Sequence, residues 1–262
     1  MPLIYLGDLR LNALLSGPAH GPAVVLLHAL GTTLTIWDDL VARLPQTLRI
    51  LRYDHRGHGA SDAPQPPYAM GGLIRDAERV MDHFALKDAV VVGSSLGGMV
   101  AQGLAVKRLD LVRGLVLSNT AAKIGTPELW AARIAQVQKT GLEDYAEPAM
   151  ERMFGRRWRE IDGVAQVRQM LTKTPPSGWI GCAAAIAGTD FYTPTAGLTL
   201  PTLAIAGTND GTTPPDLVRE TAELIRGHRY HLMRGAGHLP MVDAPQDYAT
   251  LITDFLRSIG HV

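Results

Sequence analysis

Residues 93 to 97 read Gly-Ser-Ser-Leu-Gly, a spacing that can hold a serine nucleophile. The apolar run AVVV precedes this pentapeptide, and the helix-like segment GMVAQGLAVKRL follows it. A sharp turn from strand to helix strains the backbone at Ser95, and Gly93 and Gly97 leave out side chains that would collide there. The start of the helix supplies free N–H groups and the positive end of a dipole, which favour an oxyanion. We therefore predict that Ser95 is a nucleophile.

A serine hydroxyl needs a neighbouring base, and histidine is the side chain whose pKa lies near working pH. The chain has nine histidines, of which His238 lies in the segment GAGHLP, between the apolar segment HRYHLM and the last predicted helix. Glycines before it and Pro240 after it allow a tight loop at a strand end. We predict that His238 is the base. Other histidines lie in a loop, a helix, a strand segment and the terminal region, and we expect them to be structural or exposed: His20, His83, His228, His231 and His261.

Asp210 has the position expected for the acid that orients the histidine. It follows the apolar segment TLAIAG closely and comes between Ser95 and His238, which is the chain order Ser, Asp, His. A carboxylate there can accept the imidazole N–H and stabilise the imidazolium. An aspartate beside Gly211 can also serve only as turn chemistry. The other strand end where an acid could stand, at Asn119, offers none.

An oxyanion site needs two N–H donors. The residue after the nucleophile, Leu96, supplies the first, and the loop after the apolar run AVVLLH supplies the second from the backbone of Leu30. This loop reads His-Ala-Leu-Gly, so Ala29 stands where a glycine is more usual. The detailed conformation of the loop is therefore open.

Short apolar runs alternate with helical patterns along the chain. The segments LIYL and LRLNALLS around Gly7 predict an antiparallel hairpin, and the later runs are continuous, as in strands buried on both faces of a parallel sheet. These runs are AVVLLH at 23–28, LRILRY at 48–53, AVVVG at 89–93, GLVLSN at 114–119 and TLAIAG at 202–207. Helical spacing recurs at 73–84, after Leu96, and at 248–259. The alternation predicts an α/β sheet with right-handed crossovers.

No convincing strand occurs between about residues 121 and 198. This stretch reads as helices and loops and contains aromatic and arginine side chains that the sheet does not need, including Trp130, Arg133 and Trp179. We expect a helical cap at 121–198 over the strand ends, where such sheets bind ligands, and a core formed by 1–120 and 199–262. Surface helices without ligand contact are the alternative.

Composition excludes several classes of function. Lys and Arg number 25, and so do Asp and Glu, so no basic field attracts nucleic acid. The apolar segment at 22–30 is far shorter than the roughly 20 residues that a membrane-spanning helix needs, and the N-terminus does not read as a signal peptide. A single cysteine, Cys182, suits a reducing compartment. We expect a cytoplasmic protein that binds neither nucleic acid nor a membrane, with its oligomeric state open.

The stretch YDHRGHGASD at 53–62 holds histidines and aspartates but lacks a metal-ligand pattern. We interpret it as a rigid loop. Because free cysteine is commonly buried, Cys182 is predicted to lie in the core of the cap rather than to act as a nucleophile.

The chain resembles the α/β-hydrolase family through HALG at 28, DHRGHGASD at 54, GSSLGG at 93, GTND at 207 and GAGHLPMVDAP at 235. The resemblance implies a mostly parallel eight-stranded sheet with helices on both faces and a helical cap inserted after strand 6. Four further segments are similar to those of 3-oxoadipate enol-lactonases: LGTTLTIW at 30, LRYDHRGHG at 51, SNTAAKIGTPELW at 118 and CAAAIAGTDF at 182. This similarity implies opening of the enol-lactone to 3-oxoadipate, in the β-ketoadipate route of aromatic catabolism, with no metal or organic cofactor.

A lactone of this kind carries a free carboxylate, which calls for a cationic or hydrogen-bonding partner in the cap. Arg133 is the leading candidate, with Trp179 as an apolar wall. Two other functions remain possible on the sequence. One is a carboxylesterase or cofactor-free perhydrolase with the same Ser95, Asp210 and His238. The other is a non-catalytic ligand receptor of the same fold, since function belongs to the site and not to the fold.

Overall fold

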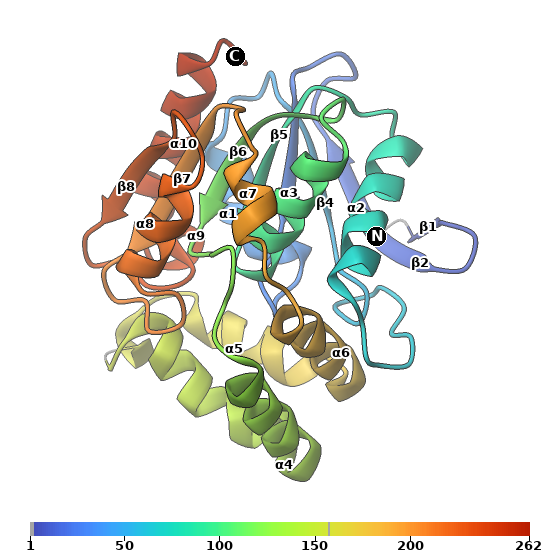
Figure 1. Ribbon diagram of the computed structural model, residues 1–262, viewed down its shortest axis with the longest axis vertical. Helices are drawn as coiled ribbons and strands as arrows, with labels where there is room; N and C mark the ends of the chain where they lie inside the picture. Colours follow the sequence, from blue (N-terminus) through green and yellow to red (C-terminus); the bar gives the residue numbers. More distant parts are fainter. Residues whose placement is uncertain (1–2, 157) are drawn as a thin grey trace.

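The computed structural model describes residues 3–156 and 158–262, which form a sheet flanked by helices with a helical layer at one end (Figure 1). The sheet has eight strands in the order β1-β2-β4-β3-β5-β6-β7-β8. β1 and β2 pair antiparallel, as do β2 and β4, and all other pairs are parallel. The strands are β1 (Leu3–Tyr5), β2 (Arg10–Ser16), β3 (Ala23–Leu27), β4 (Arg49–Tyr53), β5 (Ala89–Ser94), β6 (Val112–Ser118), β7 (Thr202–Gly207) and β8 (Arg229–Met233). The predicted hairpin and mostly parallel eight-stranded sheet are confirmed.

Burial along the strands explains their sequence patterns. The central strands β3, β5 and β7 are buried at every position, which is why they read as continuous apolar runs. The edge strand β8 exposes most of its residues, and this accounts for the polar side chains in HRYHLM. At the other edge, the Leu6 N–H donates to the Leu9 carbonyl at 2.8 Å, and Gly7 has a φ of 79°, which closes the hairpin.

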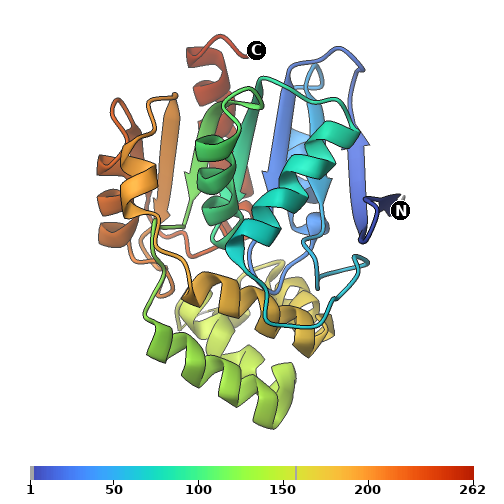
Figure 2. The same ribbon diagram turned by 45° about the vertical axis from the view of Figure 1, so that its right-hand side comes forward.

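Helices cover both faces of the sheet (Figures 1 and 2). One face carries α1 (Asp38–Arg43) and α10 (Pro245–Ser258), which contact each other and the short helix α9 (Pro240–Asp243). The opposite face carries α2 (Met70–His83), α3 (Leu96–Lys107) and α8 (Pro215–Glu223). The helices predicted at 73–84, after Leu96 and at 248–259 are present. α2 and α10 each bury one apolar stripe, whereas α3 is buried on all sides from Leu96 to Ala105.

The chain between β6 and β7 forms helices at the place predicted for an insertion. They are α4 (Pro127–Phe154), α5 (Val164–Lys173), α6 (Pro176–Ala187) and α7 (Tyr192–Ala196). Helices α4 to α6 lie beyond the end of the sheet where the parallel strands end (Figure 2), and we call them the cap. α7 packs instead on α3, where the Thr195 hydroxyl donates to Oε1 of Gln102 at 2.9 Å. The division into 121–198 and a surrounding core stays a prediction.

Two glycines let the cap helix α6 contact the loop after β4 directly through the backbone. An ideal Cβ on Gly178, in the first turn of α6, would lie 2.0 Å from the carbonyl oxygen of Gly57. A Cβ on Gly57 would lie 2.3 Å from Cα of Gly178, and Gly57 has a φ of 77°. The backbones therefore touch directly, and we call this contact the glycine seam.

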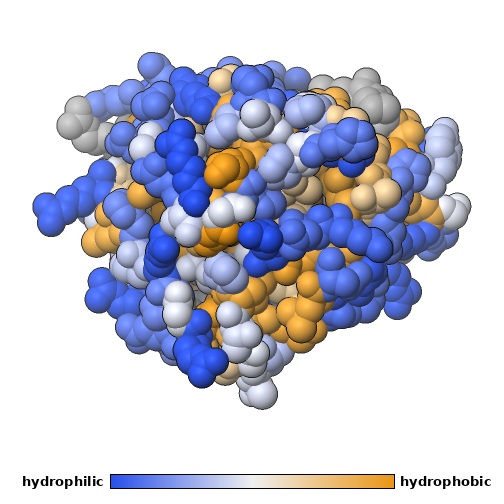
Figure 3. Space-filling view, turned by 90° about the horizontal axis from the view of Figure 1, so that it is seen from above, coloured by the Kyte–Doolittle hydropathy of each residue, from blue (hydrophilic) through white to orange (hydrophobic). Residues whose placement is uncertain are grey.

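The end of the molecule opposite the cap is covered mainly by hydrophilic side chains, with apolar side chains between them (Figure 3). Within residues 3–156 and 158–262, no helix is long and apolar enough to cross a membrane.

Candidate active site

Ser95 stands at the sharp turn between β5 and α3, with φ 53° and ψ −115°. The flanking glycines make this turn possible, because a Cβ on Gly93 would lie 2.4 Å from the Gly97 oxygen and one on Gly97 would lie 2.1 Å from the Leu27 oxygen. The Thr120 hydroxyl donates to the Ser95 carbonyl at 2.6 Å and fixes the turn from β6. The predicted strained turn is present, and it holds Ser95 where the central strands end.

His238 and Asp210 are brought together from separate loops. Nδ1 of His238 lies 2.8 Å from Oδ2 of Asp210, and both residues are almost fully buried, at 1% and 4% exposed. This contact leaves Nε2 of His238 as the nitrogen that can act on another group. The His238 ring and Ser95 line the same cavity, so the structure assembles the three residues predicted from the sequence.

The Asp210 carboxylate accepts several hydrogen bonds. Oδ1 accepts from the backbone N–H groups of Thr212 and Thr213, at 2.7 and 3.0 Å, and Oδ2 accepts from the Thr213 hydroxyl at 2.7 Å. Burial alone would raise the pKa of Asp210, but His238 and the donors on Asn119 and Thr213 outweigh it and hold that pKa below its usual value. The carboxylate is therefore kept ionised and ready to stabilise an imidazolium.

Asn119 is part of this arrangement, although its place in the sequence indicated only that no acid stands there. It follows β6 with a φ of 48°, and its Nδ2 donates to Oδ2 of Asp210 and to the Gly237 carbonyl, both at 3.0 Å. One amide therefore ties the loop of Asp210 to the loop of His238. Its place at the end of the strand beside β7 was the available signal.

The N–H groups predicted to bind an oxyanion are free to do so. Leu96 is the first residue of α3, so its N–H has no helical acceptor. Within the described residues, neither this N–H nor that of Leu30 has a hydrogen-bond acceptor. Leu30 also lines the cavity that contains Ser95.

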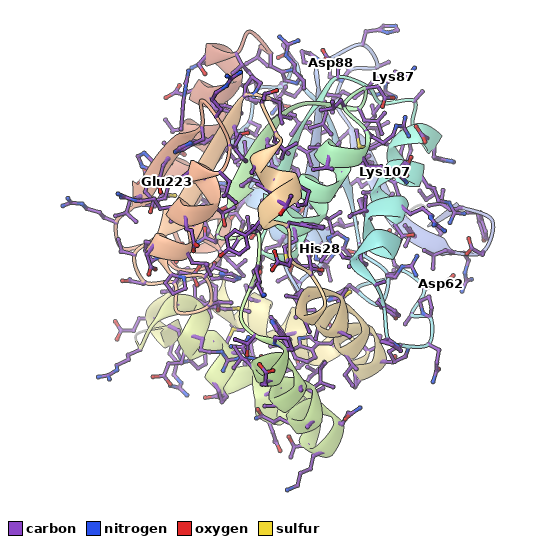
Figure 4. The ribbon with its side chains drawn as sticks, viewed as in Figure 1. His28, Asp62, Lys87, Asp88, Lys107 and Glu223 are labelled. Carbon is purple, nitrogen blue, oxygen red and sulfur yellow. The ribbon has the colours of Figure 1, made fainter. Side chains whose placement is uncertain are left out.

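Three buried histidines fix the loop that carries Leu30. Nε2 of His58 accepts the Gly31 N–H at 2.9 Å, and Nε2 of His28 accepts the His55 N–H at 2.9 Å. Figure 4 labels His28 near the end of the sheet that faces the cap, whereas Lys87 and Asp88 lie at the opposite end. The hydrogen bonds of His28 and His58 therefore fix the conformation of the loop at 28–31, which the sequence left open. Ala29, in the place of the more usual glycine, is buried within this loop.

Burial keeps these three rings neutral. Desolvation lowers the pKa of His28 to about 4 and that of His58 to about 3, and it lowers the pKa of His55 well below its usual value. The neighbouring Asp54 accepts N–H groups from Leu34 and Ala60, at 2.7 and 3.0 Å. In the described part of the chain, no group of three His, Cys, Asp or Glu residues could hold a metal ion. The 53–62 stretch is thus a hydrogen-bonded loop.

The cavity at Ser95 is small, with a volume of about 30 Å³. It is lined by core residues that include Leu30, Ser95 and His238 and by cap residues that include Trp130, Arg133, Tyr145, Arg152 and Trp179. Two larger hollows, of about 450 and 640 Å³, are lined by no serine or cysteine of the described chain. Arg133 and Trp179 therefore both line this cavity, together with Arg152, which the sequence did not single out.

The two arginines of the cavity have aromatic partners. Arg133 stacks over the Trp130 ring, with Cζ 4.8 Å from its centroid, and burial lowers its pKa. Arg152 donates to the Tyr145 hydroxyl at 2.8 Å. Neither guanidinium forms an ion pair with a carboxylate of residues 3–156 or 158–262. Two uncompensated positive charges in a small cavity favour an anionic ligand.

Cys182 has none of the features of a nucleophile. It is fully buried in α6, and its Sγ lies 3.7 Å from the Arg56 carbonyl. Burial raises the pKa of this thiol above its usual value. The predicted place in the core of the cap is confirmed.

Comparison with known proteins agrees with this geometry. The sequence model of the family described as α/β hydrolase fold matches residues 22–245. The chain therefore belongs to the α/β-hydrolase family. It is 31% identical to 3-oxoadipate enol-lactonase 2 of Acinetobacter baylyi, over 92% of this chain and 91% of that protein. The solved enol-lactonase from Burkholderia xenovorans is 33% identical, with a TM-score of 0.93 over 98% of this chain and 100% of that one.

An esterase is also among the similar structures. The thermophilic esterase from Thermogutta terrifontis is 27% identical, with a TM-score of 0.89 over 97% of this chain and 95% of that one. The chain is an ester-hydrolysing enzyme of the α/β-hydrolase family.

Proposed function

We propose that the protein opens 3-oxoadipate enol-lactone to 3-oxoadipate through an acyl-enzyme on Ser95. The observation that carries the proposal is the cavity. It combines Ser95 and His238 with the guanidinium groups of Arg133 and Arg152, which form no ion pair with a carboxylate of the described chain. A lactone with a free carboxylate matches the chemistry of both groups of lining residues, the nucleophile with its base and the two arginines. Similarity to enol-lactonases over nearly the whole chain supports the same substrate.

Ring opening would begin when His238 takes the Ser95 proton on Nε2. The Ser95 oxygen attacks the lactone carbonyl, and the developing oxyanion accepts the N–H groups of Leu30 and Leu96. Asp210, held ionised by its donors, stabilises the imidazolium through Nδ1. The bond between the acyl carbon and the ring oxygen breaks, and the oxygen leaves as an enolate that takes the proton from His238. The resulting enol tautomerises to the ketone.

The second half of the reaction uses the same groups. His238 removes a proton from water, which attacks the acyl carbonyl and releases the free carboxylate and Ser95. Protein groups, substrate and water carry every step, so the mechanism requires no cofactor. The product is a dicarboxylate of aromatic catabolism by the β-ketoadipate route.

The distal carboxylate would lie against the cap. Gly141, with φ 79° and ψ −179°, breaks α4 into two helical segments. Arg133 supplies a guanidinium from the first segment, and Arg152 supplies another from the end of the second. The Trp179 ring, 4.9 Å from that of Tyr145, supplies an apolar wall. Two arginines and an aromatic surface select a small, flat, anionic substrate.

Turnover of the enol-lactone, measured against neutral aryl esters and against peracid formation from acetate and peroxide, tests this function. We expect kcat/KM for the lactone to exceed that for neutral esters by about a hundredfold or more, and Ser95→Ala to abolish both activities. Faster turnover of neutral esters would identify a carboxylesterase, the function that similarity to an esterase favours. Peracid formation would identify a perhydrolase, and neither a burst nor turnover on any ester or lactone would favour a receptor.

The single cysteine supports a reducing compartment, so we place this activity in the cytoplasm.

A further inference from the structure

The last turn of α4 is hydrogen bonded to both loops of the catalytic pair. The Arg152 carbonyl accepts the N–H of Gly211, the residue after Asp210, at 2.8 Å. The next carbonyl, of Met153, accepts the N–H of His238 itself at 2.6 Å. The final carbonyls of a helix lack partners within the helix, and here the acid and base loops supply them.

Close packing reinforces these two bonds. A Cβ on Gly237 would lie 2.3 Å from the Met153 oxygen, and one on Gly211 would lie 3.0 Å from the Arg152 oxygen. Phe154 anchors the helix end in the core, at 3% exposed. The loops and the helix end therefore leave no space between them for a side chain.

We propose that the last turn of α4 positions two of the three catalytic residues, Asp210 and His238, relative to each other. The carbonyls of Arg152 and Met153 do this by holding the loops that carry them. The inference rests on the catalytic roles proposed above. It makes this end of the cap part of the machinery that forms the 2.8 Å contact between Nδ1 and Oδ2. The catalytic parts are His238 and Asp210, and Met153 and Arg152 act on them only through the backbone.

Charged groups around His238 come from three elements. Asp210 contacts Nδ1, Asp243 of α9 accepts the Gly237 N–H at 2.6 Å, and Arg152 of α4 lines the cavity. Displacing the end of α4 carries Arg152 with it and weakens the contact between His238 and Asp210, whereas Asp243, whose pKa burial raises to about 6, stays on α9. When the imidazolium is less stabilised, the ring takes the Ser95 proton more slowly. The ring is also protonated only at lower pH, so the acid limb of the pH–rate profile moves to lower pH.

Phe154→Ala tests the proposal, with Val137→Ala as the matched control. Val137 is also buried in α4, at 2% exposed, but lies in its first half and does not line the cavity. The readout is the rate at which a fluorophosphonate labels Ser95 as a function of pH, per folded molecule. We expect both variants to lower Tm, and only Phe154→Ala to slow labelling, by about tenfold to a hundredfold, and to move the acid limb.

Equal labelling rates and equal acid limbs in the two variants would overturn the proposal. If Phe154→Ala does not fold, Gly237→Ala approaches the same contact from the loop, with Gly71→Ala as control because nothing lies within 4 Å of a Cβ there. Unchanged labelling in Gly237→Ala would overturn it equally. Labelling does not depend on the natural substrate, so a wild type that labels at Ser95 but ignores the enol-lactone contradicts only the proposed substrate.

Discussion

Asn119 holds the carboxylate of Asp210 from the end of the neighbouring strand, with Nδ2 3.0 Å from Oδ2. The variant Asn119→Gly removes this bond while tolerating the φ of 48° at that position. Because a hydrogen bond to a charged group contributes about 1.5 to 3 kcal/mol, we expect kcat to fall about tenfold or more. Steady-state kinetics on an aryl ester provide the measurement. Gln65→Gly changes an exposed loop residue and is the control, and equal effects of the two variants would refute the role of Asn119.

Gly97→Ala is expected to damage both the fold and the nucleophile. The added Cβ would lie 2.1 Å from the Leu27 oxygen, which is backbone and cannot rotate away. We expect a loss of about 3 kcal/mol or more in the free energy of unfolding and a lower count of titratable active sites. Gly71→Ala, with open space at its Cβ, serves as the control in urea unfolding. A stable, fully titratable Gly97→Ala would contradict this account of the turn.

The buried histidines make stability fall in acid. Above pH 6.5, His28 and His58 are neutral both folded and unfolded, so they do not affect the unfolding equilibrium. Below pH 6.5 these histidines bind protons in the unfolded chain. In the folded protein they stay neutral until the pH falls to their lowered pKa values, about 4 for His28 and about 3 for His58. Each histidine then lowers the free energy of unfolding by up to about 1.4 kcal/mol per pH unit.

Urea unfolding across this pH range measures that slope. The variant His58→Gln keeps an acceptor for the Gly31 N–H and is expected to show a shallower dependence on pH. His20→Gln changes an exposed residue and is the control. An unchanged slope in His58→Gln would mean that His58 is protonated alike in both states.

Arg133→Ala is expected to raise KM for the enol-lactone about tenfold to a hundredfold and to leave a neutral aryl acetate nearly unaffected. The guanidinium lines the cavity and has no carboxylate partner among the described residues, so it is available to a substrate anion. Arg159→Ala, an exposed cap arginine paired with Glu147, is the control. The assignment of Arg133 fails if KM for the lactone is the same in this variant as in the wild type.

Cys182 is expected to resist thiol reagents in the native protein. The side chain is fully buried and its pKa is raised, so little reactive thiolate forms and none is accessible. Labelling with iodoacetamide should be complete in concentrated guanidinium and nearly absent without it, with hydrolase activity retained. Rapid native labelling with loss of activity would instead point to a thiol near the reaction.

The strands and the three catalytic candidates could be predicted because their signals are local. Buried parallel strands require continuous apolar runs, and the turn at Ser95 requires glycines at fixed spacing. Asp210 and His238 follow strands that end at one edge, so their approach follows from topology. Arg133 could be proposed as the partner of the substrate carboxylate because it is cationic and lies in the segment predicted to form the cap.

Other parts of the site left no such signal. Every residue has a backbone carbonyl, so nothing in the sequence singles out those of Arg152 and Met153. Only the folded chain brings them to the N–H groups of Gly211 and His238. Asn119 was visible in the sequence, but its partners lie far along the chain. The helix α7 falls within the predicted cap range yet packs on α3, because the sequence showed helical character without the partner of each helix.

The glycine seam between Gly57 and Gly178 limits how the enzyme can diverge. Each position would place a Cβ against the backbone of the other, so no pair of larger residues can replace them together, and a second change cannot rescue the first. The position of α6 on the 53–62 loop is therefore closed to gradual change. The side chains of Arg133 and Arg152 line the cavity from α4 rather than from the seam and can be exchanged one at a time. New substrates are reachable by altering those side chains under a cap whose docking stays constant.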